Sequence, residues 1–145
     1  MIVFCKSILA VVVAGVAVTA LTGYGSRLFA GHLSGWGLLA HMAASPLVML
    51  GFAAVALLWG ARHRFDADNG VAGGTKLLFW IMLVCALASA SSMLAAMLPV
   101  FGYIGQDRLR VIHEWSGIGL IAAGVLYMIC SRVCGKNGRI KQHAS

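Results

Sequence analysis

The sequence predicts an all-α integral membrane protein, a bundle of four transmembrane helices that run alternately up and down. Of its 145 residues, 61% are hydrophobic and only 10% are charged, and the mean hydropathy is +0.91. No soluble domain of this length needs so much apolar surface. Apolar stretches at residues 2–21, 35–59, 77–100 and 111–133 are each long enough to cross about 30 Å of hydrocarbon at about 1.5 Å per residue.

The connections between these stretches are short, so they leave no room for a separate soluble catalytic domain. We expect a single transmembrane domain over residues 1–145, ending in a basic tail at residues 134–145. Short connections also make successive helices antiparallel neighbours. The first stretch has a rival interpretation, because Lys6 followed by the apolar run 8–20 resembles a signal peptide cleaved after Ala20. We expect the helix to be retained.

Basic residues predict the orientation of the chain in the membrane. On the predicted topology, most of the 11 lysines and arginines fall on one side, and only Arg27, Arg108 and Arg110 fall on the other. The side rich in positive charge is expected to be cytoplasmic, which places both termini in the cytoplasm. The formal charge of +7 is concentrated at helix ends, so it favours lipid headgroups over nucleic acid as the partner.

Ionisable side chains inside the predicted spans are the first candidates for function, because burying them in lipid is costly. These are His41, His113 and Glu114. His41 lies about six residues into the second span and His113 about three residues into the fourth, so both are expected roughly 5 to 10 Å below the outer surface. A six-coordinate haem takes one axial ligand from each face. We therefore predict that His41 and His113 are the metal ligands of one b-type haem.

Small and basic residues near the two histidines agree with a haem site. Gly37 lies one turn before the histidine of its helix and Gly117 one turn after its own, and both leave clearance beside an imidazole. Arg27 and Arg110 occupy the same rim and are predicted to pair with haem propionates. Spacing alone also allows a second interpretation, in which the histidines form a polar clamp between helices.

The remaining histidines and Tyr127 are assigned lesser roles. His32 is half a turn out of phase with His41 and nearer the rim, so we expect it to be a poor ligand. His63 and His143 fall in segments that we predict to be solvated and inert.

We expect Tyr127 to pack or to form a hydrogen bond, with no histidine at its level. The small residues at 86–92 allow close approach of either a helix or a flat cofactor.

Several short segments resemble the four-helix b-type cytochrome membrane proteins of bacteria. They are LTG (21–23), LLAHMAASP (38–46), LLWGARHRF (57–65), FW (79–80), LPVFG (98–102) and IHEWSG (112–117), and together they span nearly the whole chain. The resemblance implies a small cytochrome b subunit that exchanges electrons between quinone and a partner, such as a larger redox complex or a periplasmic cytochrome. Catalysis proper would belong to that partner.

Two departures from the family pattern change the expected function. Members commonly carry a second histidine about 14 residues after the first, about 21 Å deeper along the helix, which ligates a second haem. Here Val55 and Tyr127 occupy these positions, so we expect a single haem near the outer face. Glu114 replaces the usual basic residue after the last-helix histidine. The alternative is a haem-free structural or anchoring subunit of a larger complex.

Overall fold

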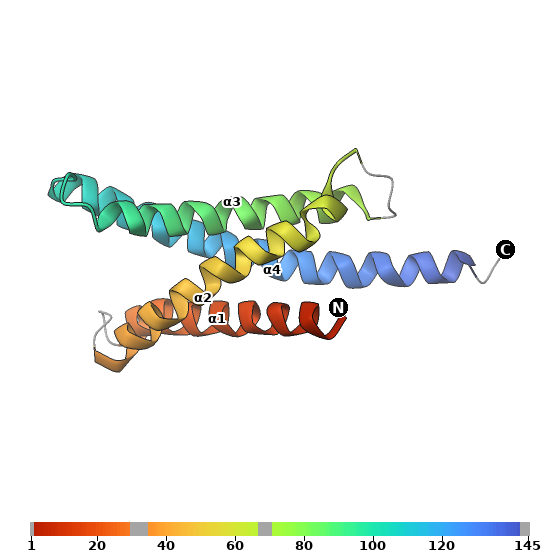
Figure 1. Cartoon of the computed structure of the whole chain (residues 1–145), viewed down its shortest axis with the longest axis horizontal. Helices are drawn as coiled ribbons and strands as arrows, with labels where there is room; N and C mark the ends of the chain where they lie inside the picture. The colour runs from red at the N-terminus through yellow and green to blue at the C-terminus, as the bar shows by residue number, and fades with distance from the viewer. Residues whose placement is uncertain (1, 30–34, 67–70, 143–145) are drawn as a thin grey trace. The chain divides into compact units, whose positions relative to one another are not determined.

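The chain is all α-helical over the residues that the computed structural model describes. These are 2–29, 35–66 and 71–142 for the backbone, and 7–25, 35–66 and 71–133 for side chains. The elements are α1 (Ile2–Phe29), α2 (Gly35–Trp59), the short 3-10 helix η1 (Gly60–His63), α3 (Gly73–Ala96) and α4 (Tyr103–Gln142) (Figure 1). All four α-helices are long and apolar enough to cross a membrane, which confirms the predicted fold class and multi-pass character.

The helix ends differ from the prediction except in α2, whose bounds agree with it. Helix α1 continues through Gly23 and Gly25 to Phe29, since a glycine costs a helix only about 1 kcal/mol. Residues 103–110 precede the fourth predicted span, yet they form the first turns of α4, so the prediction that this helix begins at residue 111 is wrong. Apolar stretches mark the segment that matches the hydrocarbon, whereas helical hydrogen bonding continues beyond it into polar sequence. Helix α3 likewise begins at Gly73, four residues before the predicted span.

The chain divides into two compact units, Met1–Leu58 and Trp59–Ser145, and each is described by itself. The single domain that we expect over residues 1–145 stays a prediction. In the first unit α1 and α2 are antiparallel, because Val12 meets Gly51 and Gly15 meets Val48. A Cβ atom on Gly15 would lie 2.7 Å from Val48 Cγ2. The two glycines therefore allow the close helix contact typical of membrane proteins.

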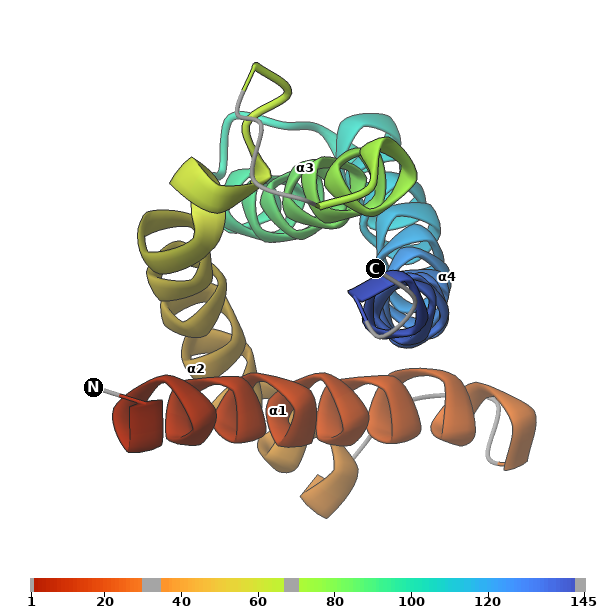
Figure 2. The same cartoon turned by 90° about the vertical axis from the view of Figure 1, so that its right-hand side faces the viewer.

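In the second unit α3 and α4 lie side by side and antiparallel (Figures 1 and 2). A Cβ atom on Gly119 would lie 3.0 Å from Cys85 Sγ, and one on Gly124 would lie 3.9 Å from Met82 Sδ. Sulfur-bearing side chains of α3 thus pack on glycines of α4, and the contact at Gly119 is the closer of the two. This contact fixes which residues of α3 face His113.

Large apolar side chains cover the outside of the helices. Trp36 is 86% exposed, Leu57 85% and Tyr103 87%, and few of the described side chains are fully buried. Monomeric soluble proteins rarely expose apolar surface on this scale. The helices are therefore compatible with contact with a lipid bilayer, and the aromatic residues near span ends suit its polar interface.

Candidate functional site

His41 is held by α1 at the ring nitrogen Nδ1. Nδ1 lies 3.1 Å from the Thr19 carbonyl oxygen and 3.0 Å from Thr22 Oγ1. The imidazole also packs on Gly23, where a Cβ atom would lie 3.4 Å from His41 Cε1. A Cβ atom at Gly23 would therefore already be in van der Waals contact with the ring. Three neighbouring residues of α1 therefore set the position and orientation of His41.

His113 is held in the same way by α3. Its Nδ1 lies 2.9 Å from Ser89 Oγ and 3.0 Å from the Ser89 carbonyl oxygen. That carbonyl also accepts a hydrogen bond from Ser92 Oγ at 2.9 Å, and the Ser92 side chain is buried. The half-buried His113 ring is thus fixed against the middle of α3 by residues of the small-residue run.

Hydrogen bonding to a carbonyl determines the tautomer of both histidines. A carbonyl oxygen only accepts, so the Nδ1 atom that contacts it carries the proton. In the neutral imidazole the lone pair then resides on Nε2. Metal-ligating histidines commonly have this arrangement, with the distal N–H donated to a carbonyl or carboxylate and the other nitrogen donated to the metal. In each unit Nε2 is therefore the unprotonated nitrogen of the neutral ring.

A haem needs fewer protein ligands than a closed metal site. Among the residues whose side chains are described, no three histidine, cysteine, aspartate or glutamate side chains gather to hold a metal ion. Structural zinc sites need four such ligands, whereas a porphyrin supplies four nitrogens itself and requires only axial ligands. Single imidazoles with a fixed tautomer meet that requirement.

Of the four other predicted site residues, the structure describes Gly37, Gly117 and the side chain of Arg110. Gly37 and Gly117 are half-buried in α2 and α4, one turn from the histidine of their helix. Arg110 is exposed, and its guanidinium lies 3.5 Å from the Asp107 carboxylate one turn away. Such an exposed pair is weak, so Arg110 can exchange this partner for another carboxylate. The Arg27 side chain and all of His32 lie outside the described residues.

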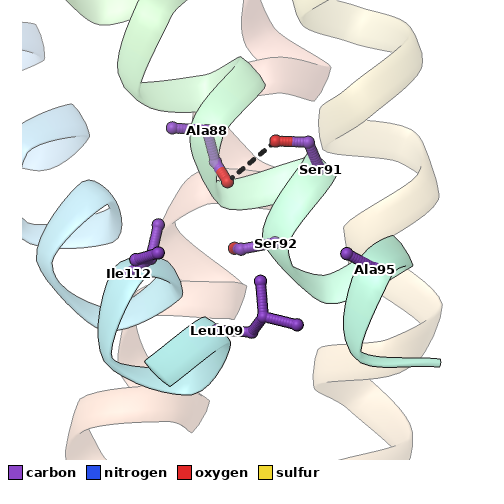
Figure 3. Close-up of a pocket in the computed structure, with 6 residues that line it drawn as sticks. All are labelled: Ala88, Ser91, Ser92, Ala95, Leu109 and Ile112. Carbon is purple, nitrogen blue, oxygen red and sulfur yellow. Dashed lines mark hydrogen bonds between the residues drawn. The ribbon is translucent and has the colours of Figure 1, made fainter. Parts of the chain in front are cut away.

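A small apolar notch is lined by residues of α3 and α4 (Figure 3). Its volume is about 270 Å³, and it is lined by Ala88, Ser91, Ser92, Ala95, Leu109 and Ile112. The Ser91 hydroxyl donates to the Ala88 carbonyl at 3.2 Å, so it turns back onto its own helix. The small residues of α3 therefore permit helix packing and also leave apolar space beside Leu109 and Ile112 of α4.

His63 contradicts the prediction that it is solvated, since it is only 3% exposed. Its ring stacks on Phe79 with centroids 4.1 Å apart and planes 14° apart. Nδ1 donates to the Trp59 carbonyl at 3.0 Å, and Nε2 lies 3.1 Å from the Tyr127 hydroxyl. The Trp80 indole donates to the His63 carbonyl at 2.9 Å. The 3-10 turn of η1 directs the ring inward, which the polar sequence around it did not reveal.

This contact also changes the interpretation of Tyr127. It forms a hydrogen bond, as expected, but a histidine does lie at its level, which corrects the prediction that none would. Because the Nδ1 proton of His63 goes to a carbonyl, Nε2 accepts from the Tyr127 hydroxyl. We call His63, Phe79, Trp80 and Tyr127 the inner cluster. Both ring nitrogens of His63 are engaged there, so the cluster has the character of a structural contact.

The sequence did not identify Thr19, Thr22, Gly23 or Ser89 as parts of a site. Thr22 and Gly23 belong to the LTG segment and Ser89 to the small-residue run, so the only signal was a polar or small residue in an apolar helix. Such residues are also ordinary packing positions. Their role depends on which turn of the neighbouring helix meets each histidine. Neither a protein-family model, nor a curated protein, nor a solved structure matches the chain.

Proposed function

We propose that this chain is a membrane electron-transfer subunit that binds one b-type haem near the outer face of the membrane. His41 and His113 would be its axial ligands, and Arg27 and Arg110 would pair with its propionates. The subunit exchanges electrons with quinone, with a partner redox protein, or with both, and is not itself catalytic. The membrane is the bacterial inner membrane, with both termini in the cytoplasm.

The observation that supports the proposal is the matched support of the two histidines. In each unit a neighbouring helix offers one carbonyl and one hydroxyl to Nδ1. A metal ligand benefits from partners that fix its tautomer and raise its basicity. The same pattern on two histidines at matching predicted depths favours a shared role as ligands.

The residues of the chain would each contribute a defined part to electron transfer. A bound haem supplies a one-electron carrier whose potential depends on its ligands and surroundings. Thr19, Thr22 and Ser89 orient the imidazoles, and Gly23 allows one of them to lie close to α1. The apolar helices exclude water from the ligands, so protein dipoles act on them in a medium of low dielectric constant.

A haem-free structural or anchoring subunit is the second candidate. The hydrogen bonds of His41 and His113 would equally tie each helix pair together, since polar side chains stabilise helix contacts in lipid. In that case the protein would carry no visible chromophore. The two candidates therefore differ in one property that is easily measured.

The spectrum of the purified protein tests the proposal directly. We expect a Soret band, an alpha band on reduction and about one haem per chain, because the chain carries one predicted pair of ligands. Haem is quantified as its pyridine adduct against the protein concentration. A featureless visible spectrum would support the anchor instead. A ratio near two would show that the inner end of the chain holds a second haem.

The proposed orientation predicts the labelling of introduced cysteines. In a chain whose four native cysteines are replaced by alanine, Ala72→Cys should resist a membrane-impermeant thiol reagent in intact cells. Ala72 is exposed at the start of α3, on the side with the excess of positive charge. Tyr103→Cys is the matched control, since Tyr103 is 87% exposed at the opposite end of the unit. Labelling of Ala72→Cys from outside, with Tyr103→Cys protected, would reverse the topology.

A further inference from the structure

We infer that Thr22 and Ser92 are positioning residues that tune the two predicted haem ligands in opposite directions. Thr22 strengthens electron donation by His41, whereas Ser92 weakens electron donation by His113. The inference rests on the proposed function. Thr22 contacts Nδ1 of His41 directly, and Ser92 contacts the carbonyl that accepts from Nδ1 of His113. Each of these contacts lies inside one unit.

The hydroxyl of Thr22 is an acceptor for His41. Its proton is donated to the Val18 carbonyl at 2.7 Å, a shorter contact than the 3.3 Å to the Thr19 carbonyl. Its oxygen therefore presents a lone pair to the Nδ1–H of His41 at 3.0 Å. The Thr19 carbonyl is a second acceptor at 3.1 Å. Acceptors at Nδ1 draw the proton away from the ring and raise the basicity of the other nitrogen. The short bond to Val18 polarises the hydroxyl and strengthens this effect, because linked hydrogen bonds reinforce one another.

Ser92 has the opposite effect on His113. The Ser89 carbonyl accepts from His113 Nδ1 at 3.0 Å and from Ser92 Oγ at 2.9 Å. Two side-chain donors therefore share one carbonyl, and each withdraws electron density from the oxygen that serves the other. Ser92 is only 4% exposed, so water does not readily replace its contact with the carbonyl. The imidazole of His113 is consequently held by a weaker acceptor than an unshared carbonyl would be.

These contacts predict opposite changes in haem potential for two small substitutions. A more basic axial imidazole stabilises ferric iron and lowers the reduction potential. Thr22→Val keeps the shape of the side chain but removes the acceptor, so His41 becomes less basic and the potential rises. Ser92→Ala removes the competing donor, so the Ser89 carbonyl binds Nδ1–H more strongly and the potential falls.

The test is a spectroelectrochemical titration of the full-length protein in lipid nanodiscs. At a fixed applied potential the ratio of reduced to oxidised haem should rise up to about tenfold in Thr22→Val and fall in Ser92→Ala, where tenfold corresponds to about 59 mV for one electron. Thr22→Ser keeps the hydroxyl and should restore the wild-type potential. Ser91→Ala is the matched control, because the Ser91 hydroxyl donates to Ala88 and should leave the potential unchanged.

The outcomes separate this inference from the proposed function. Wild-type protein without haem refutes both. Haem at the wild-type potential in both variants, or shifts of the same sign, overturns the inference alone. If Thr22→Val does not retain haem, haem binding by Thr22→Ser is measured instead. Retention by Thr22→Ser supports the positioning role, since such outer partners typically contribute about 10- to 100-fold to metal affinity, and equal loss in both variants refutes it.

Discussion

Replacing either His41 or His113 with alanine is expected to abolish the low-spin haem spectrum. If both imidazoles bind one iron, removal of either leaves at most five-coordinate haem, because the membrane interior offers few replacement ligands. Each single variant should lose the sharp alpha band of the reduced protein. The double variant should lose little more, because two residues that act as one unit are not additive. Optical and electron paramagnetic resonance spectra of membranes prepared in parallel measure the effect.

Two controls make the ligand test specific. His32→Ala should keep a low-spin spectrum, since the sequence places His32 half a turn away from the face of His41. Circular dichroism should show unchanged helix content in both ligand variants, because each loses only a half-buried side chain. The assignment is wrong if His41→Ala or His113→Ala keeps a normal bis-histidine spectrum, or if His32→Ala destroys it.

Composition and apolar length were sufficient to predict the four spans but not the ends of the helices. Helix α2 agrees with its predicted bounds because Gly35 begins it and the 3-10 turn at Gly60 ends it, both at positions where apolar sequence also stops. In α1 and α4 the helix continues into polar sequence. The length of an apolar stretch reflects the thickness of the hydrocarbon layer. The length of a helix is set by where its backbone hydrogen bonds stop.

The sequence predicted the two histidines but not the groups that hold them. A histidine inside an apolar span is visible by itself, because its burial is costly. Thr22 and Ser89 become significant only once α1 is seen against His41 and α3 against His113. The antiparallel registers of these pairs depend on Gly15, Gly51 and Gly119, and a single sequence does not specify which glycine meets which side chain.

His63 shows how local composition can mislead. It stands between Arg62 and Arg64, and this basic context is typical of a solvated loop. In the structure Arg64 is exposed and pairs with Asp66 at 2.8 Å, while His63 points inward to Phe79 and Tyr127. Adjacent residues on a tight helical turn point in different directions. Charge on the neighbours therefore does not determine the environment of the histidine.

The burial of His63 predicts the largest change in stability. His63→Ala removes a ring stacked on Phe79 and the hydrogen-bond partner of Tyr127, and it leaves a cavity where α3 and α4 meet η1. Loss of a buried ring typically costs about 3 to 5 kcal/mol. Tyr127→Phe removes only a hydroxyl and should cost about 1 kcal/mol, because side-chain hydrogen bonds in membrane proteins are individually weak. Unfolding in sodium dodecyl sulfate, followed by circular dichroism, measures both.

The neighbouring arginine provides the matched control for this prediction. Arg64→Ala changes a side chain that is 64% exposed and pairs with an equally exposed Asp66, so its effect should stay below about 1 kcal/mol. Trp80 reports the same event locally, because its indole donates to the His63 carbonyl at 2.9 Å. In a variant that retains Trp80 as its only tryptophan, His63→Ala should shift the fluorescence to longer wavelength as η1 loosens and the indole is hydrated. Unchanged stability together with unchanged Trp80 emission would mean that the inner cluster does not hold η1 against α3 and α4.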